Sequence, residues 1–171
     1  MNYNFRKATS IETTKIWEIL KQAIVRRKND GSQQWQDGYP NKVVIQQDIA
    51  KGVGYVLTED EDTIIGYAAI LFNDEPAYKQ LNGTWLTNED FAVVHRVAIS
   101  DDYLGKGFAQ KIFLYTEDLA IGNNIFSIKV DTNFDNIPML KILEKLGYTY
   151  CGEVTFRGSF RKAFEKIFPS F

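Results

Sequence analysis

The sequence predicts a single-domain α/β fold, in which a central, mixed and twisted sheet of about six to seven strands is flanked by about four helices. The first observation is size, because 171 residues with 44% hydrophobic content can bury one substantial core. The second is a strand, a helix and a strand within residues 91 to 131, a βαβ unit whose two strands should be parallel neighbours. The third is that no repeat, linker or low-complexity tract interrupts residues 1 to 171.

Composition narrows the class of protein. A net charge of −2 gives no positive field for a phosphate backbone, so we expect no nucleic-acid partner. No apolar run reaches membrane-spanning length and the first residues lack a signal-peptide core, so we expect a cytoplasmic protein without a membrane partner. One cysteine and one histidine speak against a disulfide framework and a zinc site. The oligomeric state is open, a homodimer included.

The N-terminal half is expected to begin with a strand and a capped helix. Thr9 and Glu12 form a capping-box pattern ahead of apolar residues at helical spacing. A loop with large aromatic side chains follows the helix, and we expect it to wall a pocket or to form a lid. The predicted elements are a strand at 3 to 8, helices at 11 to 28 and 42 to 51, and hairpin strands at 54 to 59 and 63 to 72.

The C-terminal half is expected to hold the βαβ unit and two closing strands. Residues 73 to 90 are polar and read as irregular. Gly122 is placed as the C-terminal cap of the long helix, and Gly147 as the stop of the next one. The predicted strands are at 91 to 99, 125 to 131, 148 to 156 and 162 to 168. One predicted helix begins at about 107 and ends at Gly122, and the other begins within 133 to 138 and ends at Gly147.

The most informative segment is 97 to 109, where an apolar strand runs into a glycine-bearing turn that opens a helix. Gly105 and Gly107 allow a sharp turn and a close approach of the backbone to a ligand. The first N–H groups of a helix have no partner within it, and together with the helix dipole they favour an anion. The segment therefore indicates a phosphate site.

The order of elements and this segment resemble the GNAT superfamily of acyl-CoA-dependent N-acyltransferases. The family signature is Gln or Arg, two residues, Gly, one residue, then Gly or Ala, and here it falls on Leu104, Gly107 and Ala109. Leu104 departs from the signature. A second landmark matches, because Asn136 stands eleven residues before Gly147. The resemblance implies a GNAT-type fold over nearly the whole chain.

The resemblance also implies where acetyl-CoA, the co-substrate, would bind. The backbone of Val97, Ala98 and Ile99 would hydrogen-bond the pantetheine arm as an added strand. Asn136 would face that arm and Met139 would line its channel, while the acceptor would approach past Trp35 and Tyr39. The pyrophosphate would be held by Leu104, Gly105, Lys106, Gly107, Phe108 and Ala109.

Acyl transfer to an amine needs a base, because an alkyl amine is mostly protonated at neutral pH. His95 is the candidate base by residue type and by its position just before the strand segment that would hold CoA. Glu89 or Asp90, acting through water, are alternatives. Backbone N–H groups of Val97 to Ile99 would stabilise the oxyanion, as the family implies.

An acid for the departing sulfur is harder to find. Many family members place a Tyr four residues before the downstream Gly, and this chain has Leu143 there. Tyr148 is the candidate substitute, with Tyr103 and Tyr150 as alternatives, and a thiolate can also leave unaided.

The sequence thus predicts an N-acetyltransferase that moves an acetyl group from acetyl-CoA to a primary amine of a small molecule, peptide or protein, by direct attack on the thioester and without a metal. One alternative is a non-catalytic acyl-CoA-binding or sensing protein on the same scaffold. A distant third is a thiol hydrolase that uses Cys151 and His95.

Overall fold

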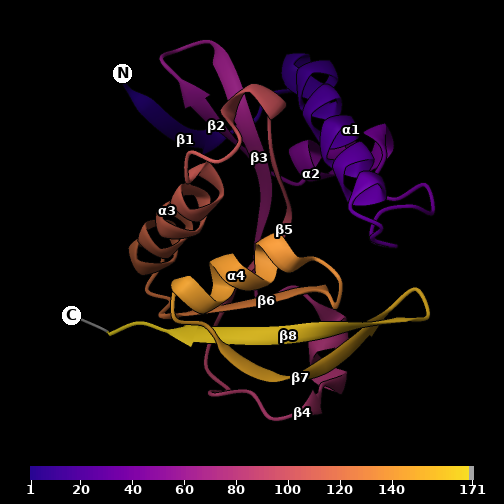
Figure 1. Cartoon of the computed structure of the whole chain (residues 1–171). Coiled ribbons are helices and arrows are strands. Elements are labelled where there is room, and N and C mark those ends of the chain that lie inside the picture. Colours follow the sequence, from indigo (N-terminus) through magenta and orange to yellow (C-terminus); the bar gives the residue numbers. More distant parts are fainter. Residues whose placement is uncertain (170–171) are drawn as a thin grey trace. The chain divides into compact units, whose positions relative to one another are not determined.

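The computed structural model describes residues 1–169, which form a mixed α/β fold (Figure 1). Eight strands in this part of the chain form one sheet in the order β1-β2-β3-β5-β6-β8-β7-β4. The four α-helices are α1 (Thr13–Asn29), α2 (Lys42–Ala50), α3 (Phe108–Gly122) and α4 (Ile137–Lys145). The strands are β1 (Tyr3–Lys7), β2 (Gly54–Glu59), β3 (Thr63–Phe72), β4 (Asn82–Gly83), β5 (Ala92–Ile99), β6 (Ser127–Asn133), β7 (Thr149–Phe156) and β8 (Ser159–Ile167). Short 3₁₀ turns are η1 (Ser10–Glu12), η2 (Pro76–Gln80) and η3 (Asp101–Tyr103).

The predicted α/β class and mixed sheet are confirmed, and the sheet has one strand more than the expected range. The additional strand is β4, inside the segment that reads as irregular. It is two residues long, which is too short to show a periodicity. Gly83 of β4 pairs with Gly152 of β7, and a Cβ at either position would collide with the opposite backbone, so glycine is what allows this pairing.

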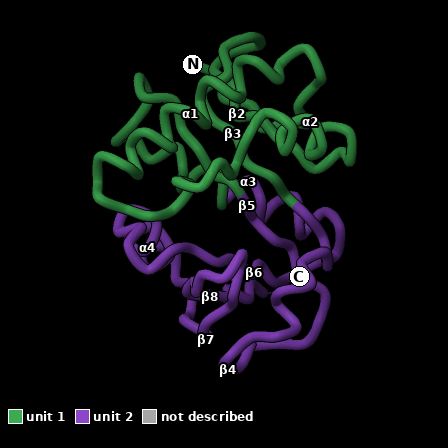
Figure 2. Tube along the Cα trace, turned by 90° about the vertical axis from the view of Figure 1, so that its right-hand side faces the viewer, with its two compact units in different colours: residues 1–70, 96–113 green, residues 71–95, 114–171 purple. Residues whose placement is uncertain are grey.

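The chain divides into two compact units (Figure 2). Unit 1 comprises Met1–Ile70 and Arg96–Phe113, and unit 2 comprises Leu71–His95 and Leu114–Phe171. The boundaries fall within β3, β5 and α3. Each unit is described by itself below, and the single domain stays a prediction.

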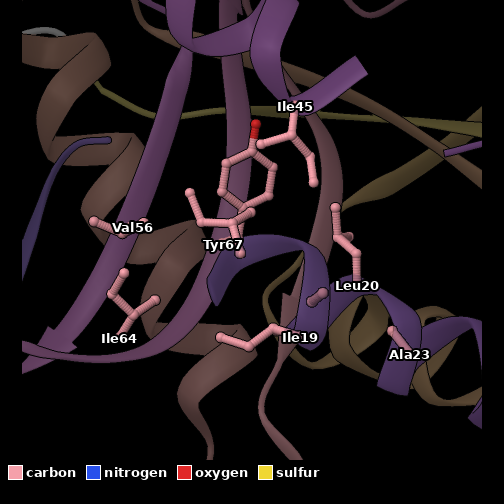
Figure 3. Close-up of a cluster of buried hydrophobic side chains, with 9 residues drawn as sticks. Ile19, Leu20, Ala23, Ile45, Val56, Ile64 and Tyr67 are labelled. Carbon is pink, nitrogen blue, oxygen red and sulfur yellow. The ribbon is translucent and has the colours of Figure 1, made fainter. Parts of the chain in front are cut away.

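The core of unit 1 is built on the helical spacing of α1. Ile16, Ile19, Leu20 and Ala23 recur every three or four residues, and all four are buried. Figure 3 shows the ring of Tyr67 among side chains from α1, α2 and the strands. The complete buried cluster is Ile16, Ile19, Leu20, Ala23, Ile45, Val56, Ile64, Tyr67 and Ala98.

The predicted capping box forms, but it caps a 3₁₀ turn. Thr9 N donates to Glu12 Oε2 (2.8 Å), and Arg6 of β1 pairs with the same carboxylate (2.6 Å). The capped turn is η1, so α1 begins at Thr13, two residues later than expected. The capping signal therefore located the start of helical backbone but not the start of the α-helix.

In unit 2 the parallel pairing of the βαβ unit is confirmed. β5 pairs in parallel with β6 through Ala92↔Ile128 and Val93↔Lys129. β8 then pairs antiparallel with both β6 and β7. The β7–β8 hairpin closes through Arg157 and Gly158, whose positive φ values (47° and 76°) suit a two-residue turn.

At the helix ends of unit 2, the predicted stop at Gly147 is confirmed and the predicted cap at Gly122 is wrong. Gly147 (φ 83°) stops α4: its N–H donates to Glu144 O, and Tyr148 N donates to Leu143 O (2.9 Å). Gly122, in contrast, is the last residue of α3 and not its cap. The left-handed residue there is Asn124 (φ 60°), because asparagine also tolerates this conformation.

Candidate functional site

The predicted phosphate turn follows β5 in unit 1. Gly105 (φ 72°) and Gly107 (φ 79°) both adopt left-handed backbone, which a side chain disfavours by ~1 to 2 kcal/mol. A Cβ added to either glycine would meet no other atom within 4 Å. Glycine is therefore needed here for its backbone conformation, and the space beside it is open.

The turn presents a run of unpaired backbone donors. Among the described residues, no acceptor bonds to any N–H from Gly105 through Gln110. Lys111 N is the next donor, and it bonds to Gly107 O (3.1 Å). Consecutive N–H groups at the start of a 15-residue helix form a site of positive potential. These donors fit the phosphate groups of a nucleotide-like ligand.

Other side chains hold the turn in place. Arg26 of α1 donates from Nη2 to Ile99 O (2.9 Å) and pairs with Asp101 through Nη1. Gln22 Oε1 accepts from Asp101 N (2.9 Å). Lys106 Nζ donates to Asp102 O (3.3 Å) and adds positive charge at the turn. Helix α1 thus fixes the point where β5 ends and the turn begins.

Leu104, Phe108 and Ala109 complete the predicted phosphate segment. Leu104 is 43% exposed where the family signature has Gln or Arg. Phe108 is buried and packs edge-on against Tyr3 (5.0 Å between ring centroids). Ala109 lies in the first turn of α3. Phe108 therefore anchors the helix start, while the segment's polar surface comes from the backbone.

The strand segment Val97 to Ile99 follows a backbone irregularity at Arg96. Arg96 has a φ of 55°, which is uncommon for a non-glycine residue within a strand. Its guanidinium is held by Asp48 of α2, with Nε 2.9 Å from Oδ2 and Nη2 2.6 Å from Oδ1. Both side chains are buried, at 11% and 6% exposure. A two-point ion pair thus fixes the residue that sets the direction of the following strand segment.

Two tyrosines complete this buried network. Tyr67 OH donates to Asp48 Oδ2 (2.6 Å), and Arg96 Nη1 donates to the Tyr39 hydroxyl (2.6 Å). Burial and the nearby Asp48 raise the pKa of Tyr67, so the phenol stays neutral. Burial alone would lower the pKa of Arg96, but Tyr39 and Asp48 outweigh it and the pKa is raised. Tyr39, predicted to bind substrate, is therefore attached to the residue before Val97.

Trp35, the other predicted substrate residue, is half-buried and packs against the core cluster of unit 1. It has a positive φ (63°) in the loop between α1 and α2. The indole therefore anchors this loop to the core. A role in substrate binding stays a prediction.

His95, the predicted base, lies in unit 2 between two carboxylates. Its Nε2 is 2.6 Å from Glu75 Oε2, and its Nδ1 is 3.9 Å from Asp131 Oδ2. Because a carboxylate accepts, Nε2 is the donor in the short bond, and Nδ1 faces the carboxylate of Asp131. Tyr78 OH donates to Asp131 Oδ2 (2.6 Å). The geometry is that of a histidine oriented by an acid, as a general base requires.

The sequence did not identify the acid that orients His95. Glu75 lies 20 residues before His95, at the start of the segment expected to be irregular. Glu89 and Asp90, the alternatives weighed from sequence, are both exposed, and Asp90 Oδ1 accepts from Asn73 Nδ2 (3.3 Å). Glu75 also caps η2 by accepting from Ala77 N, a contact that is seen only in the folded chain.

Tyr148, the predicted acid, is buried in unit 2. Burial and the charge of Glu117 raise its pKa well above the ordinary value. A phenol that holds its proton so tightly is a weak acid for a departing thiolate. Tyr103 donates to Glu59 Oε2 (2.6 Å), and Tyr150 is exposed beside Phe164.

Asn136 and Met139 lie at the start of α4. Asn136 is buried and its Oδ1 accepts from Met139 N (3.3 Å), so it caps the helix. Met139 is half-buried. The family landmark at Asn136 thus has a structural role in this chain, and contact with a pantetheine arm stays a prediction for both residues.

Cys151 is buried, and burial together with the nearby Glu165 raises the pKa of its thiol. Such a thiol has little thiolate character at neutral pH, which argues against a nucleophile. Within residues 1–169, no group of three or more His, Cys, Asp or Glu side chains is arranged to hold a metal ion. In the same residues, no helix has the length and apolar composition needed to cross a membrane.

Comparisons with known proteins agree with this architecture. The model of the acetyltransferase (GNAT) family matches residues 16–148. A crystal structure of a GNAT-family acetyltransferase from Streptococcus agalactiae 2603 is 36% identical, with a TM-score of 0.87 over 98% of this chain and 96% of that chain. A GNAT-family acetyltransferase from Listeria monocytogenes 4b F2365 shares the fold at 19% identity, with a TM-score of 0.77 over 97% and 95% of the two chains.

A curated relative is streptothricin acetyltransferase from Escherichia coli, which is 27% identical over 93 residues. The match covers 54% of this chain and spans about half (51%) of that relative. The family model covers the larger part of the chain, including β5, the glycine turn and α3. Together with the fold, it shows that this chain belongs to the acetyltransferase (GNAT) family.

Proposed function

We propose that this chain is an N-acetyltransferase that moves an acetyl group from acetyl-CoA to a primary amine by direct attack on the thioester. The observation that carries the proposal is the run of unpaired N–H groups from Gly105 through Gln110 at the start of α3. These donors suit a pyrophosphate, and CoA is the phosphate-bearing substrate of this family. Membership of the family supports acetyl transfer as the reaction.

The residues that would hold acetyl-CoA come from β5 and the turn. The turn amides and Lys106 would bind the pyrophosphate, and the backbone of Val97 to Ile99 would bind the pantetheine arm. When bound, acetyl-CoA supplies an activated acetyl group. The ion pair between Arg96 and Asp48 would keep the strand segment rigid, which favours preorganised N–H donors over mobile ones.

His95 would serve as the base that makes the amine nucleophilic. The amine gives up a proton to the imidazole of His95, its nitrogen bonds to the carbonyl carbon, and the C–S bond breaks with release of the thiolate. Glu75 orients the ring through the 2.6 Å bond to Nε2 and stabilises the imidazolium that forms. Since Tyr148 is a weak acid, we propose that the thiolate leaves without proton transfer from a tyrosine.

A second candidate function is acyl-CoA binding without turnover. It is favoured by the fully buried Leu143 at the position where many family members have the acid, and by the raised pKa of Tyr148. The phosphate turn would be the same in both cases, so the candidates differ only at the reacting atoms.

Two measurements separate these candidates. Acetyl-CoA at about 100 times its dissociation constant should raise the melting temperature by roughly 5–10 °C, whereas ATP and NAD should not. Absence of this shift contradicts both candidates. Thiol release from acetyl-CoA across a panel of small and peptide amines then identifies an enzyme, and stabilisation without thiol release with any amine identifies a binding protein.

A further inference from the structure

A pocket of about 740 Å³ opens within unit 2, between the segment at residues 73 to 91 and β6. Its volume is in the range of small-molecule sites. Its lining includes the acidic residues Asp74 and Glu75, the basic residues Lys79 and Lys129, and the aromatic residues Trp85 and Phe91. The same pocket therefore presents both signs of charge next to aromatic surface.

Lys129 of β6 is the unusual member of this lining, because only 4% of it is exposed. Its ammonium lies 4.6 Å from the ring centroid of Trp85 and 4.2 Å from that of Phe91. Among the described residues, no oxygen lies within hydrogen-bonding or ion-pair distance of Lys129 Nζ. The Lys129 side chain is thus almost wholly buried, and its ammonium has no anionic or hydrogen-bonding partner to offset the cost of burying a charge.

The carboxylate opposite Lys129 does not pair with its ammonium. Glu165 of β8 is its cross-strand neighbour and is fully buried. However, Glu165 Oε1 accepts from Ser127 Oγ (2.7 Å), and Oε2 accepts from Leu86 N (2.6 Å). Burial lowers the pKa of Lys129 even though Glu165 acts to raise it. The ammonium is therefore stabilised incompletely by the protein itself.

The aromatic walls around Lys129 are held in place. Trp85 Nε1 donates to Tyr78 O (2.9 Å), and its ring packs against that of Tyr78 (5.1 Å between centroids). Phe91 N donates to Asn73 Oδ1 (2.9 Å), and Asn73 N donates to Phe91 O (3.0 Å). The aromatic surface around Lys129 is thus preorganised, and the ammonium of Lys129 has no counter-ion.

We propose that this pocket binds the carboxylate of the acceptor at Lys129, so that the acceptor is an amino carboxylate such as an amino acid. This inference rests on the proposed function. Glu75 lines the same pocket and bonds to His95, so an acceptor held at Lys129 would present its amine on the side of the proposed base. The negative charges of Asp74 and Glu75 favour the ammonium and disfavour an acceptor with more than one anionic charge.

The test compares amines that differ only by a carboxylate. L-lysine is paired with 1,5-diaminopentane, and 5-aminopentanoate with 1-aminobutane, and each dissociation constant is measured by titration calorimetry. O-phosphoethanolamine tests a phosphate in place of the carboxylate. We expect each amino carboxylate to bind wild-type protein at least tenfold more tightly than its partner amine.

Lys129→Met keeps the apolar length of the side chain and removes the charge. We expect it to abolish the preference for the carboxylate while leaving the affinity for the simple amines unchanged. Lys79→Met is the matched control, because Lys79 lines the same pocket but is exposed, and it should keep the preference. Lys129→Gln provides a second variant if Lys129→Met does not fold.

The proposal is overturned if wild-type protein binds each amino carboxylate no better than its partner amine, if the preference survives Lys129→Met, or if O-phosphoethanolamine binds best. These outcomes differ from failure of the proposed function. A carboxylate preference that depends on Lys129, without thiol release in the presence of acetyl-CoA, supports the pocket assignment and refutes the transferase.

Discussion

Gly107→Glu tests the placement of the phosphate site at the start of α3. The substitution puts a carboxylate beside the unpaired N–H groups from Gly105 through Gln110. Two effects oppose acetyl-CoA there, since the new side chain can accept from these donors and its charge repels a pyrophosphate. The dissociation constant for acetyl-CoA should therefore rise.

The magnitude follows from charge and backbone geometry. Two unit charges ~5 Å apart at an effective dielectric constant of ~20 repel by ~3 kcal/mol, which corresponds to ~150-fold in affinity. The cost to folding is much smaller. A Cβ at Gly107 meets no other atom within 4 Å, so the penalty is the left-handed φ of 79°, about 1 to 2 kcal/mol.

Gly158→Glu is the matched control for this strain. Gly158 has a φ of 76°, and a Cβ there also meets no other atom within 4 Å. Both variants should lose a similar amount of stability in thermal denaturation, but only Gly107→Glu should lose affinity for acetyl-CoA in calorimetry. Equal affinity of Gly107→Glu and the parent protein would refute the placement of the site.

Three further predictions concern the base and the buried network. His95→Gln should lower kcat/KM by about 10² to 10⁴-fold and remove the acidic limb of its pH profile, and an unchanged profile would exclude His95 as the base. Asp48→Ala should destabilise the fold by about 3–5 kcal/mol, seen in urea titrations, because it leaves Arg96 buried without its counter-charge. Burial raises the pKa of Tyr67 and of Tyr78 above the value of ~10 in the unfolded chain, so the stability that they contribute is complete below pH ~10 and lost above it. Urea titrations should show little change from pH ~9 to ~9.5 and, above pH ~10.5, a loss that approaches about 1.4 kcal/mol per pH unit for each phenol, and Tyr67→Phe should reduce that slope.

Much of the fold was predictable because its elements carry local patterns. The hairpin strands β2 and β3 match the expected ranges, and α2 ends one residue early. The errors fall where the pattern is weak or ambiguous. The two residues of β4 show no periodicity, and Asn124 rather than Gly122 takes the left-handed position after α3.

The candidate site also has one part with a local sequence pattern and other parts without one. The glycine turn is visible in sequence because its conformation depends on the residues that form it. The partner of His95 is not visible, since any of several carboxylates in residues 73 to 90 satisfies a sequence argument, and only folding brings Glu75 to 2.6 Å from the ring. The pairing of Arg96 with Asp48 joins residues 48 positions apart and has no local signature.

The sequence by itself determined the α/β class, the order of the main elements and the location of the glycine turn, because periodicity, caps and glycine conformation act over a few residues. Tertiary structure alone decided which acid orients His95, which pair fixes the strand before Val97, and that Lys129 is buried between two rings without a counter-ion. Those properties depend on distance and burial between residues far apart in the chain, and no local pattern encodes them.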